Sequence, residues 1–270
     1  MNGRKLHIAF CTDDAFAQYT SVAICSLIFN ASDPATLHLW ILDAGLSRKS
    51  RQLIESIPHK FKTQIDFLLV DFIEDQTLVA DRHISRATYG RLFLPEILDK
   101  SIKTCLYLDG DVIVVDDIFK LGAFSCNSYP IAAVDDFYLT KDDTLSIPNP
   151  FNYFNAGVLL VNLEKWRRDN IADQILDFVR DYPEKLTYWD QDAMNAVLYN
   201  VRMPLPLRWN QQIHFDDCLS HLPDGRKTSE MKEAMSNPAI VHFVGPEKPW
   251  HYLCLHPYKD LYLKYRERSP

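Results

Sequence analysis

The alternation of short apolar runs with helix-length segments is the feature of this sequence that most restricts its fold. Mostly apolar runs occupy residues 6–11, 37–42 and 65–70. Residues 14–30 and 47–57 lie between them and are predicted to be helices, and Ser47 is a residue type that favours a helix N-cap. Continuous apolar strands that alternate with helices predict an α/β fold, with a mostly parallel sheet covered by helices on both faces.

The alternation continues to the end of the chain. Further strands are predicted at residues 104–108, 112–115, 131–134, 157–161 and 239–243, and further helices at 85–98, 163–182 and 189–199. Residues 211–237 are polar and weakly patterned, which predicts a loop or a lid, whereas periodic aromatics after His251 predict a final helix. No internal repeat or clear linker is visible, so we expect one domain over residues 1–250 and a C-terminal tail over 251–270.

Charge and cysteine usage narrow the partners and the compartment. The 270 residues carry a net charge of -7, which argues against a nucleic-acid partner bound through a basic surface. No apolar run approaches the roughly 20 residues of a transmembrane helix, and no signal peptide is recognisable. The six cysteines form no CxxC pair, and several lie in apolar runs. We therefore expect reduced core cysteines and a cytoplasmic protein.

Polar side chains at the ends of the predicted strands are the first candidates for a site. In a doubly wound parallel sheet, ligands bind beyond the carboxyl ends of the strands. The residues that follow an apolar strand directly or within a few positions are Asp13, Asp109, Asp111, Asp135 and His242. This rule selects them before any family is considered.

The sharpest candidate is the segment Asp109-Gly110-Asp111. In extended backbone, carboxylates at positions i and i+2 point to the same side, and Gly110 between them lets a ligand approach closely. Two carboxylates beside a buried sheet repel each other unless a proton or a cation is present, and a divalent metal would leave coordination positions for phosphate oxygens. The alternative is a solvated turn between two strands, for which Asp-Gly is common.

A second candidate is the segment around His242. An imidazole nitrogen can complete an oxygen-rich metal site and shifts its preference from Mg²⁺ towards Mn²⁺. Gly245 offers a backbone N–H, and Lys248 a positive charge, to a phosphate. The alternative is a core histidine followed by a surface turn.

Two further stretches combine polar and small residues. Asn155 and Ala156 precede an apolar strand, where an amide can bind sugar hydroxyls and a small residue leaves room for them; a plain loop entering the strand is the alternative. Asp190, Gln191 and Asp192 open a predicted helix. Helix capping accounts for one acidic residue there, but it does not require all three.

In this order, the stretches resemble glycosyltransferase family 8, particularly its bacterial lipopolysaccharide and lipooligosaccharide α-galactosyltransferases. The resemblance runs from Ile8 to Trp250. The matching strings are Leu42–Gly45, Arg82–Ser85, Tyr89–Leu92, Tyr107–Asp111, Phe154–Leu160, Asn162–Arg167, Asp190–Asp192 and Gly245–Trp250.

The resemblance implies a GT-A fold, in which a Rossmann-like nucleotide half merges with an acceptor half that includes a C-terminal lid segment. It implies transfer of galactose or glucose from a UDP-sugar with retention of configuration, assisted by Mn²⁺ or, alternatively, Mg²⁺. The acceptor would be a saccharide such as lipopolysaccharide core, another cell-surface glycan or a lipid-linked sugar. The sequence does not choose between galactose and glucose, and it leaves the acceptor and the oligomeric state open.

The resemblance also implies roles for individual residues. The metal ligands would be Asp109, Asp111 and His242. The diphosphate would meet Gly245 and Lys248. Asp13 would bind the uridine, and the Phe16 ring would stack on uracil. The donor sugar would meet Arg91, Asp135, Asn155, Ala156, Asp190 and Gln191, and donor and acceptor would meet near His83. Further contacts to the UDP-sugar would come from Cys11, Thr12, Asp109 and Gly110. Ala15 departs from the family, which often has Asn there, and this removes one contact to the nucleoside.

Retention of configuration leaves the role of Asp190 and Gln191 open. A double displacement needs a nucleophile beneath the anomeric carbon. Gln191 is placed for that role by resemblance, but an amide is a poor nucleophile, and Asp190 is chemically the better one. We expect a same-face, oxocarbenium-like route in which both residues act as electrostatic partners.

Two other classes of protein share parts of this pattern. A metal-dependent nucleotidyltransferase would release pyrophosphate and normally has a Gly-rich, basic loop after the first strand, whereas residues 11–16 read Cys-Thr-Asp-Asp-Ala-Phe. A non-catalytic sugar-nucleotide-binding protein would bind UDP without turnover. The tail at 258–268 mixes aromatic and basic residues, which predicts either peripheral contact with the inner face of the cytoplasmic membrane or a helix docked on the domain.

Overall fold

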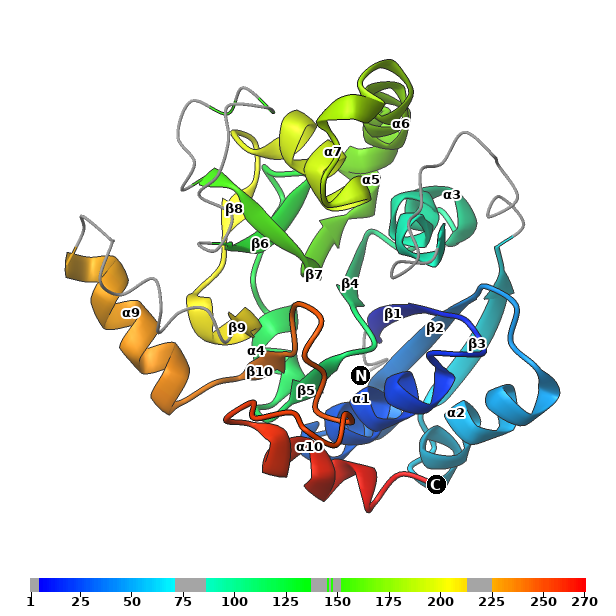
Figure 1. The fold of residues 1–270 in the computed structure, drawn as a ribbon. Coiled ribbons are helices and arrows are strands. Elements are labelled where there is room, and N and C mark those ends of the chain that lie inside the picture. Colours follow the sequence, from blue (N-terminus) through cyan, green and yellow to red (C-terminus); the bar gives the residue numbers. More distant parts are fainter. Residues whose placement is uncertain (1–4, 71–85, 137–144, 146, 148–151, 213–224) are drawn as a thin grey trace.

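The central element of the fold is a seven-stranded sheet in the order β3-β2-β1-β4-β7-β6-β8 (Figure 1). The computed structural model describes residues 5–70, 86–136, 145, 147, 152–212 and 225–270. The strands are β1 (Leu6–Thr12), β2 (Leu37–Asp43), β3 (Gln64–Leu69), β4 (Thr104–Leu108), β6 (Ile131–Asp135), β7 (Phe154–Asn162) and β8 (Met203–Pro204). Strand β7 runs antiparallel to β4 and β6, and the other pairings in the sheet are parallel. The predicted α/β fold with a mostly parallel sheet is confirmed.

Helices cover both faces of this sheet (Figure 1). Alternate residues of β1 explain why its run is apolar throughout: Ile8 and Phe10 pack with α1 and α2, whereas Ala9 and Cys11 pack with the helices of the other face. Burial of one such large apolar side chain contributes roughly 1.5–3 kcal/mol. The helices on the first face are α1 (Ala17–Asn30) and α2 (Arg48–Lys60), and those on the other are α3 (Leu94–Ile97), α5 (Leu163–Arg168), α6 (Ile171–Asp181) and α7 (Trp189–Leu198).

A second, three-stranded sheet positions the C-terminal part of the chain against the first. Its order is β5 (Val112–Val114), β10 (Ile240–His242) and β9 (Gln211–Gln212). Strand β10 is antiparallel to β5 and parallel to β9, with His242 opposite Val112. Since β5 follows β4 after three residues, this pairing brings the end of β10 to the turn that leaves the central sheet.

The remaining short elements connect these layers. They are η1 (Pro34–Thr36), η3 (Arg86–Phe93), α4 (Ile118–Gly122), η6 (Pro183–Lys185), η7 (Leu207–Asn210), α9 (Gly225–Ser236) and α10 (Lys259–Arg266). Helix α2 begins as predicted, because the Ser47 hydroxyl accepts a hydrogen bond from the Ser50 backbone N–H at 3.2 Å.

Three predicted boundaries differ from the structure. The segment 86–97 is a 3₁₀ helix followed by one α-helical turn, because Pro95 lies in the first turn of α3 and has no N–H for an α-helix running through it. The first helix starts at Ala17, after a turn in which the Asp13 carboxylate accepts the Phe16 N–H at 2.9 Å. Strand β7 starts at Phe154, so Asn155 and Ala156 belong to the strand rather than to a loop.

The prediction of a loop or lid over 211–237 is wrong for the residues that the structure describes. Residues 211–212 form β9, and residues 225–236 form the helix α9, while 213–224 lie outside the described residues. Helix α9 buries Met231 and Ala234 in the main core. So few apolar positions in twelve residues give a weak periodic signal, which explains the error.

The C-terminal helix α10 is confirmed, and it is docked on the domain. Tyr262 and Tyr265 are buried in a cluster with Val22 and Phe243, and the Tyr265 hydroxyl accepts a hydrogen bond from the Asn30 amide at 2.7 Å. The aromatic face of the tail is therefore used in packing. Among the described residues, no helix has the length and apolar character needed to cross a bilayer.

Candidate active site

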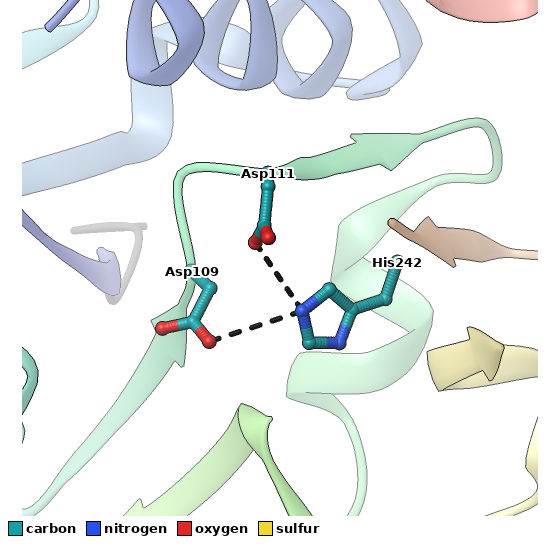
Figure 2. Close-up of side chains that lie close together, drawn as sticks. All are labelled: Asp109, Asp111 and His242. Carbon is teal, nitrogen blue, oxygen red and sulfur yellow. Dashed lines mark ion pairs between the residues drawn. The ribbon is translucent and has the colours of Figure 1, made fainter. Parts of the chain in front are cut away.

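Asp109, Asp111 and His242 point towards one another at the junction of the two sheets (Figure 2). The Nε2 atom of His242 lies 3.2 Å from Oδ1 of Asp111 and 3.9 Å from Oδ2 of Asp109. One potential ligand atom from each residue falls within 4.8 Å of the others. The side chains are 25%, 12% and 5% exposed in the order Asp109, Asp111, His242, so the group is open on the aspartate side.

Backbone pairing holds this triad in place. Asp109 directly follows β4, and its N–H donates to the Gly157 carbonyl of β7 at 2.8 Å. Asp111 directly precedes β5, and its carbonyl accepts the Phe243 N–H at 3.1 Å, next to His242 at the end of β10. Asp109 therefore stands at the carboxyl end of a strand of the central sheet, as the rule for parallel sheets predicts, while Asp111 stands at the start of β5 and His242 at the end of β10.

Two glycines beside the triad are surrounded by different side chains. A Cβ on Gly157 would lie 2.2 Å from Cε1 of His242 and 2.8 Å from Oδ2 of Asp109, so only glycine leaves room for the triad. A Cβ on Gly110 would instead lie 2.4 Å from Oγ1 of Thr20 and 3.2 Å from Cδ1 of Phe16. The prediction that Gly110 makes room for a ligand is therefore corrected, because helix α1 and the residue before it occupy that space.

The triad fits a divalent cation. Two carboxylates and one imidazole form a donor set suited to Mn²⁺ or another borderline divalent ion. Burial alone would raise the pKa of the Asp111 carboxyl, but Lys248 and His242 lower this pKa well below its usual value. Asp111 is therefore a carboxylate at neutral pH. Tyr107 donates its hydroxyl to Oδ1 of Asp109 at 2.9 Å, which orients the other carboxylate.

The segment after His242 brings Lys248 and Gly245 to the same site. The Lys248 ammonium is 2.6 Å from Oδ2 of Asp111 and 2.5 Å from the Phe243 carbonyl. Gly245 has a φ of +79°, a left-handed conformation that favours glycine, and it is exposed. A positive charge and a glycine turn thus lie directly beside the metal-compatible group.

Arg91 connects the triad to the start of helix α7. Its guanidinium lies 3.4 Å from Oδ1 of Asp109 and 2.9 Å from Oδ2 of Asp190, and it also donates to the Ala156 carbonyl. Burial would lower the pKa of Arg91, but the two carboxylates raise this pKa further, so the guanidinium stays charged. Arg91 stacks over the Tyr107 ring at 4.6 Å.

Gln191 is fixed beside Asp190 by hydrogen bonds in several directions. Its Oε1 accepts the Ala156 N–H at 2.9 Å, and its Nε2 lies 3.2 Å from the Tyr153 hydroxyl and 3.4 Å from Oδ2 of Asp136. The third polar residue of this stretch, Asp192, has a structural role. Its carboxylate accepts the N–H groups of residues 187 and 188 at 2.6 Å and closes the start of α7.

Asp135 and Asp136 divide their roles. The Asp135 carboxylate pairs with the buried guanidinium of Arg202. Asp136 contacts Nδ2 of Asn155 at 3.2 Å and also faces Gln191. The structure therefore joins Asp136 to the predicted sugar pocket through described contacts, while Asp135 remains a sequence prediction.

The predicted nucleoside contacts begin beside Gly110, which lies between the two aspartates in the chain. Phe16 packs beside Gly110 and meets Trp250 edge-on at a centroid distance of 5.6 Å, while Trp250 stacks on Tyr19 at 3.7 Å. The Thr12 hydroxyl is hydrogen-bonded to Thr20, at 2.9 Å. Cys11 is buried beside Gly90, and burial raises the pKa of its thiol, so it is a neutral core residue.

Some residues of the site were not predicted from the sequence. One predicted residue, His83, lies outside the described residues, in the segment 71–85. The functional neighbours that sequence reasoning missed are Tyr107, Tyr153, Asp136, Gly157 and Asn210. Tyr107 and Gly157 carried a signal, since both lie inside the strings already singled out, and Tyr153 directly precedes one of them. The five cysteines that the structure describes are free and buried, as predicted.

A carboxylate–histidine group at the junction of the two sheets, with a lysine, an arginine and buried polar side chains beside it, is the arrangement expected of a glycosyltransferase of GT-A fold. The model of glycosyl transferase family 8 matches residues 7–254. The chain belongs to this family and is a glycosyltransferase.

Several relatives cover nearly the whole chain. General stress protein A of Bacillus subtilis is 34% identical over 96% of this chain and 92% of its own length. Lipopolysaccharide 1,3-galactosyltransferase of Salmonella typhimurium is 26% identical over 98% of this chain and 78% of its own length. The crystal structure of the galactosyltransferase LgtC, in complex with donor and acceptor sugar analogues, is 27% identical, covers 98% of this chain and 96% of its own, and has a TM-score of 0.88.

Proposed function

We propose that this protein transfers galactose or glucose from a UDP-sugar to a saccharide acceptor, with retention of configuration. The observation that carries the proposal is that Arg91 joins the metal-compatible triad to Asp190 within one site. Relatives named as lipopolysaccharide galactosyltransferase and glucosyltransferase support a hexose donor and an acceptor such as lipopolysaccharide core or another cell-surface glycan.

The triad would hold Mn²⁺ or Mg²⁺ through Asp109, Asp111 and His242. When bound, such an ion supplies Lewis-acid stabilisation of the negative charge that develops on UDP. Lys248, 2.6 Å from Asp111, adds a fixed positive charge on the same side, and the exposed Gly245 would offer its backbone N–H. Phe16 beside Gly110 would contact the uracil ring, and Asp13 the nucleoside.

The donor sugar would lie between Arg91 and the start of α7. Asp190 lies 2.9 Å from the Arg91 guanidinium, and its carboxylate would stabilise positive charge on an oxocarbenium-like sugar. Hydrogen bonds to Ala156 and Tyr153 fix the Gln191 amide next to it. We favour same-face attack by the acceptor, with both residues as electrostatic partners. A covalent sugar adduct on Asp190 or Gln191, trapped and located by mass spectrometry, would overturn this route.

UDP release from a panel of UDP-sugars tests the proposed function without knowledge of the acceptor. We expect one hexose donor to be hydrolysed slowly with Mn²⁺ and not after EDTA treatment. Release of pyrophosphate instead of UDP would identify a nucleotidyltransferase. UDP binding without turnover, in the presence of mixed saccharide acceptors, would identify a binding protein.

The cellular compartment and the membrane contact can be tested separately from the reaction. We propose a cytoplasmic protein that contacts the inner face of the membrane, where lipid-linked acceptors lie. The support is the loop before α10, where Tyr252, Leu253 and Leu255 are 94%, 83% and 91% exposed. The Lys259 ammonium orders this loop by contacting the carbonyls of residues 251, 252 and 254 at 2.9–3.2 Å.

Sedimentation with anionic liposomes decides this membrane contact. The tail aromatics are packed on the domain, so deleting the tail would damage the fold, and substitution of the exposed loop is the cleaner test. We expect the triple variant Tyr252→Ser, Leu253→Ser, Leu255→Ser to lose most liposome binding. Equal partitioning of the variant and the unaltered protein would reject the proposal.

A further inference from the structure

Asn210 is a fully buried amide that the proposed reaction has not yet used. It ends η7, directly before β9, and it lies between Asn155 and His242. Its two polar atoms contact one residue each: Nδ2 is 2.9 Å from Oδ1 of Asn155, and Oδ1 is 3.0 Å from Nδ1 of His242. Buried amides are hydrogen-bonded in a defined orientation. The orientation of Asn155 can therefore determine the orientation of Asn210, and with it the atom that faces His242.

The orientation of Asn155 is set by groups that cannot change their role. The backbone N–H of Gly157 is an obligatory donor, and it lies 2.9 Å from the side-chain atom Oδ1 of Asn155. On its other side, Nδ2 of Asn155 faces a carboxylate oxygen of Asp136 at 3.2 Å. The Asn155 oxygen must therefore be the acceptor for both Gly157 and Asn210.

This fixes Asn210 in turn. Because Asn155 presents an oxygen, Asn210 must present its NH₂ group there and its own oxygen to His242. An amide oxygen only accepts, so the Nδ1 atom of His242 must carry a proton. In the neutral imidazole the proton is then absent from Nε2, the atom that faces Asp109 and Asp111.

We infer that Asn210, oriented by Asn155, is a positioning residue that holds His242 in the Nδ1–H tautomer, so that Nε2 presents its lone pair to the metal group. The inference rests on the proposed metal site. Groups that orient a ligating histidine in this way raise its metal affinity, and their loss typically weakens binding about 10- to 100-fold.

We call the hydrogen-bonded series Asn155–Asn210–His242 the relay. It is needed because the site also accommodates the opposite tautomer of His242. An Nε2–H would point at Oδ1 of Asp111, 3.2 Å away, and would form a charge-assisted hydrogen bond there. In the metal-free protein, a ring without the Asn210 oxygen would therefore favour the Nε2–H form. That form blocks the ligating atom.

The tautomer can be read directly in metal-free protein labelled with ¹⁵N-histidine. In a long-range ¹H–¹⁵N spectrum at about pH 8, with the His242 signals assigned by their loss in His242→Asn, we expect a pyrrole-type Nδ1 and a pyridine-type Nε2. Asn210→Leu should shift the pattern towards Nε2–H, and Gln212→Leu, which leaves the Asn210 side chain in place, should keep the native pattern. Asn210→Ser, with its shorter side chain, repeats the Leu test if Asn210→Leu does not fold.

Mn²⁺ binding in the presence of UDP, followed by the electron paramagnetic resonance of free Mn²⁺, gives the second readout. We expect Asn210→Leu to bind about 10- to 100-fold more weakly. Gln212→Leu, which removes a buried amide two residues away that bonds to backbone carbonyls, should bind normally. A tautomer shift in a protein that binds no Mn²⁺ would support the relay and refute the metal site. An unchanged tautomer in both Asn210→Leu and Asn210→Ser would overturn the inference.

Discussion

A methyl group on Gly157 would lie 2.2 Å from Cε1 of His242, so the antiparallel strand β7 touches the histidine that arrives from the far end of the chain. The same methyl would lie 2.8 Å from Oδ2 of Asp109. Gly157→Ala should therefore push the His242 and Asp109 side chains apart by several tenths of an ångström or more. Because misplacement on the scale of 1 Å can cost roughly 100-fold in rate, we expect a loss of that order in metal-dependent UDP release.

The matched control is Gly122→Ala. A methyl there would lie 2.7 Å from Cδ1 of Leu6, which is the far end of a flexible side chain away from the triad. We expect this variant to keep its activity with at most a small loss in thermal stability. Equal activity of the two variants would show that Gly157 is not required for the geometry of the site.

The aspartates themselves provide the second prediction. Asp109→Asn and Asp111→Asn keep the size of each side chain but remove the charge that a cation needs. We therefore expect turnover to fall by at least about 100-fold. The circular dichroism melt should remain cooperative. Asp116→Asn is the control. Asp116 follows β5 at the end away from Asp111, and its carboxylate pairs with Lys120 and Arg208. Near-normal turnover of either triad variant would refute the metal assignment.

Arg91→Lys tests the connection between the metal group and the sugar pocket. A single ammonium cannot reproduce the guanidinium contacts to Asp109, Asp190 and the Ala156 carbonyl. Loss of one or two charged hydrogen bonds at about 1.5–3 kcal/mol each corresponds to at least a tenfold loss in kcat/KM for UDP-sugar hydrolysis. The control is Arg51→Lys, because Arg51 is 44% exposed and pairs with the buried Asp43 outside the described site, so kcat/KM should stay unchanged.

The sequence predicted the parts of the fold that depend on local patterns. Strands β1 and β4 are apolar on both faces because helices cover both faces, and this leaves a pattern that can be recognised without the structure. The helix α9 was missed because its side chains bury at few positions. The segment at Pro95 was predicted as one helix because a proline in a first turn and a proline inside a helix look alike in a sequence.

The site was predictable where its residues follow strands and unpredictable where they meet across the chain. Asp109 follows β4 and His242 ends β10, so a rule on strand ends selects them, and Asp111 comes with Asp109 from the spacing of two residues. The neighbouring pair Asp135 and Asp136 shows the limit, because the register of β6 against β7 shifts between Ala133 and Asp135. Such an irregularity changes which side chain faces which side of the sheet. Asn210 acquires its role only from Asn155 and His242, and no local pattern marks it.

The last prediction concerns pH and a histidine far from the triad. His38 of β2 stacks on Trp40 at 3.9 Å, and its Nε2 is 2.6 Å from the Asp66 carboxylate. Burial lowers the pKa of His38 below its usual 6.5, although Asp66 opposes the shift. The unfolded chain therefore takes up this proton at a higher pH than the folded protein does. The stability linked to His38 is complete above pH 6.5 and is lost as the pH falls below it, through the folded pKa.

His38→Gln removes this titration, so its urea midpoint should fall less than that of the unaltered protein between pH 7.5 and pH 5. The pKa of Asp66 is also lowered, from 3.8, so the loss of its contribution begins below this window. The control His59→Gln removes an exposed histidine near the end of α2 and should follow the unaltered protein. If His38→Gln and the unaltered protein lose the same stability over this range, the buried imidazole is not the group that titrates. The acid sensitivity would then belong to the carboxylates.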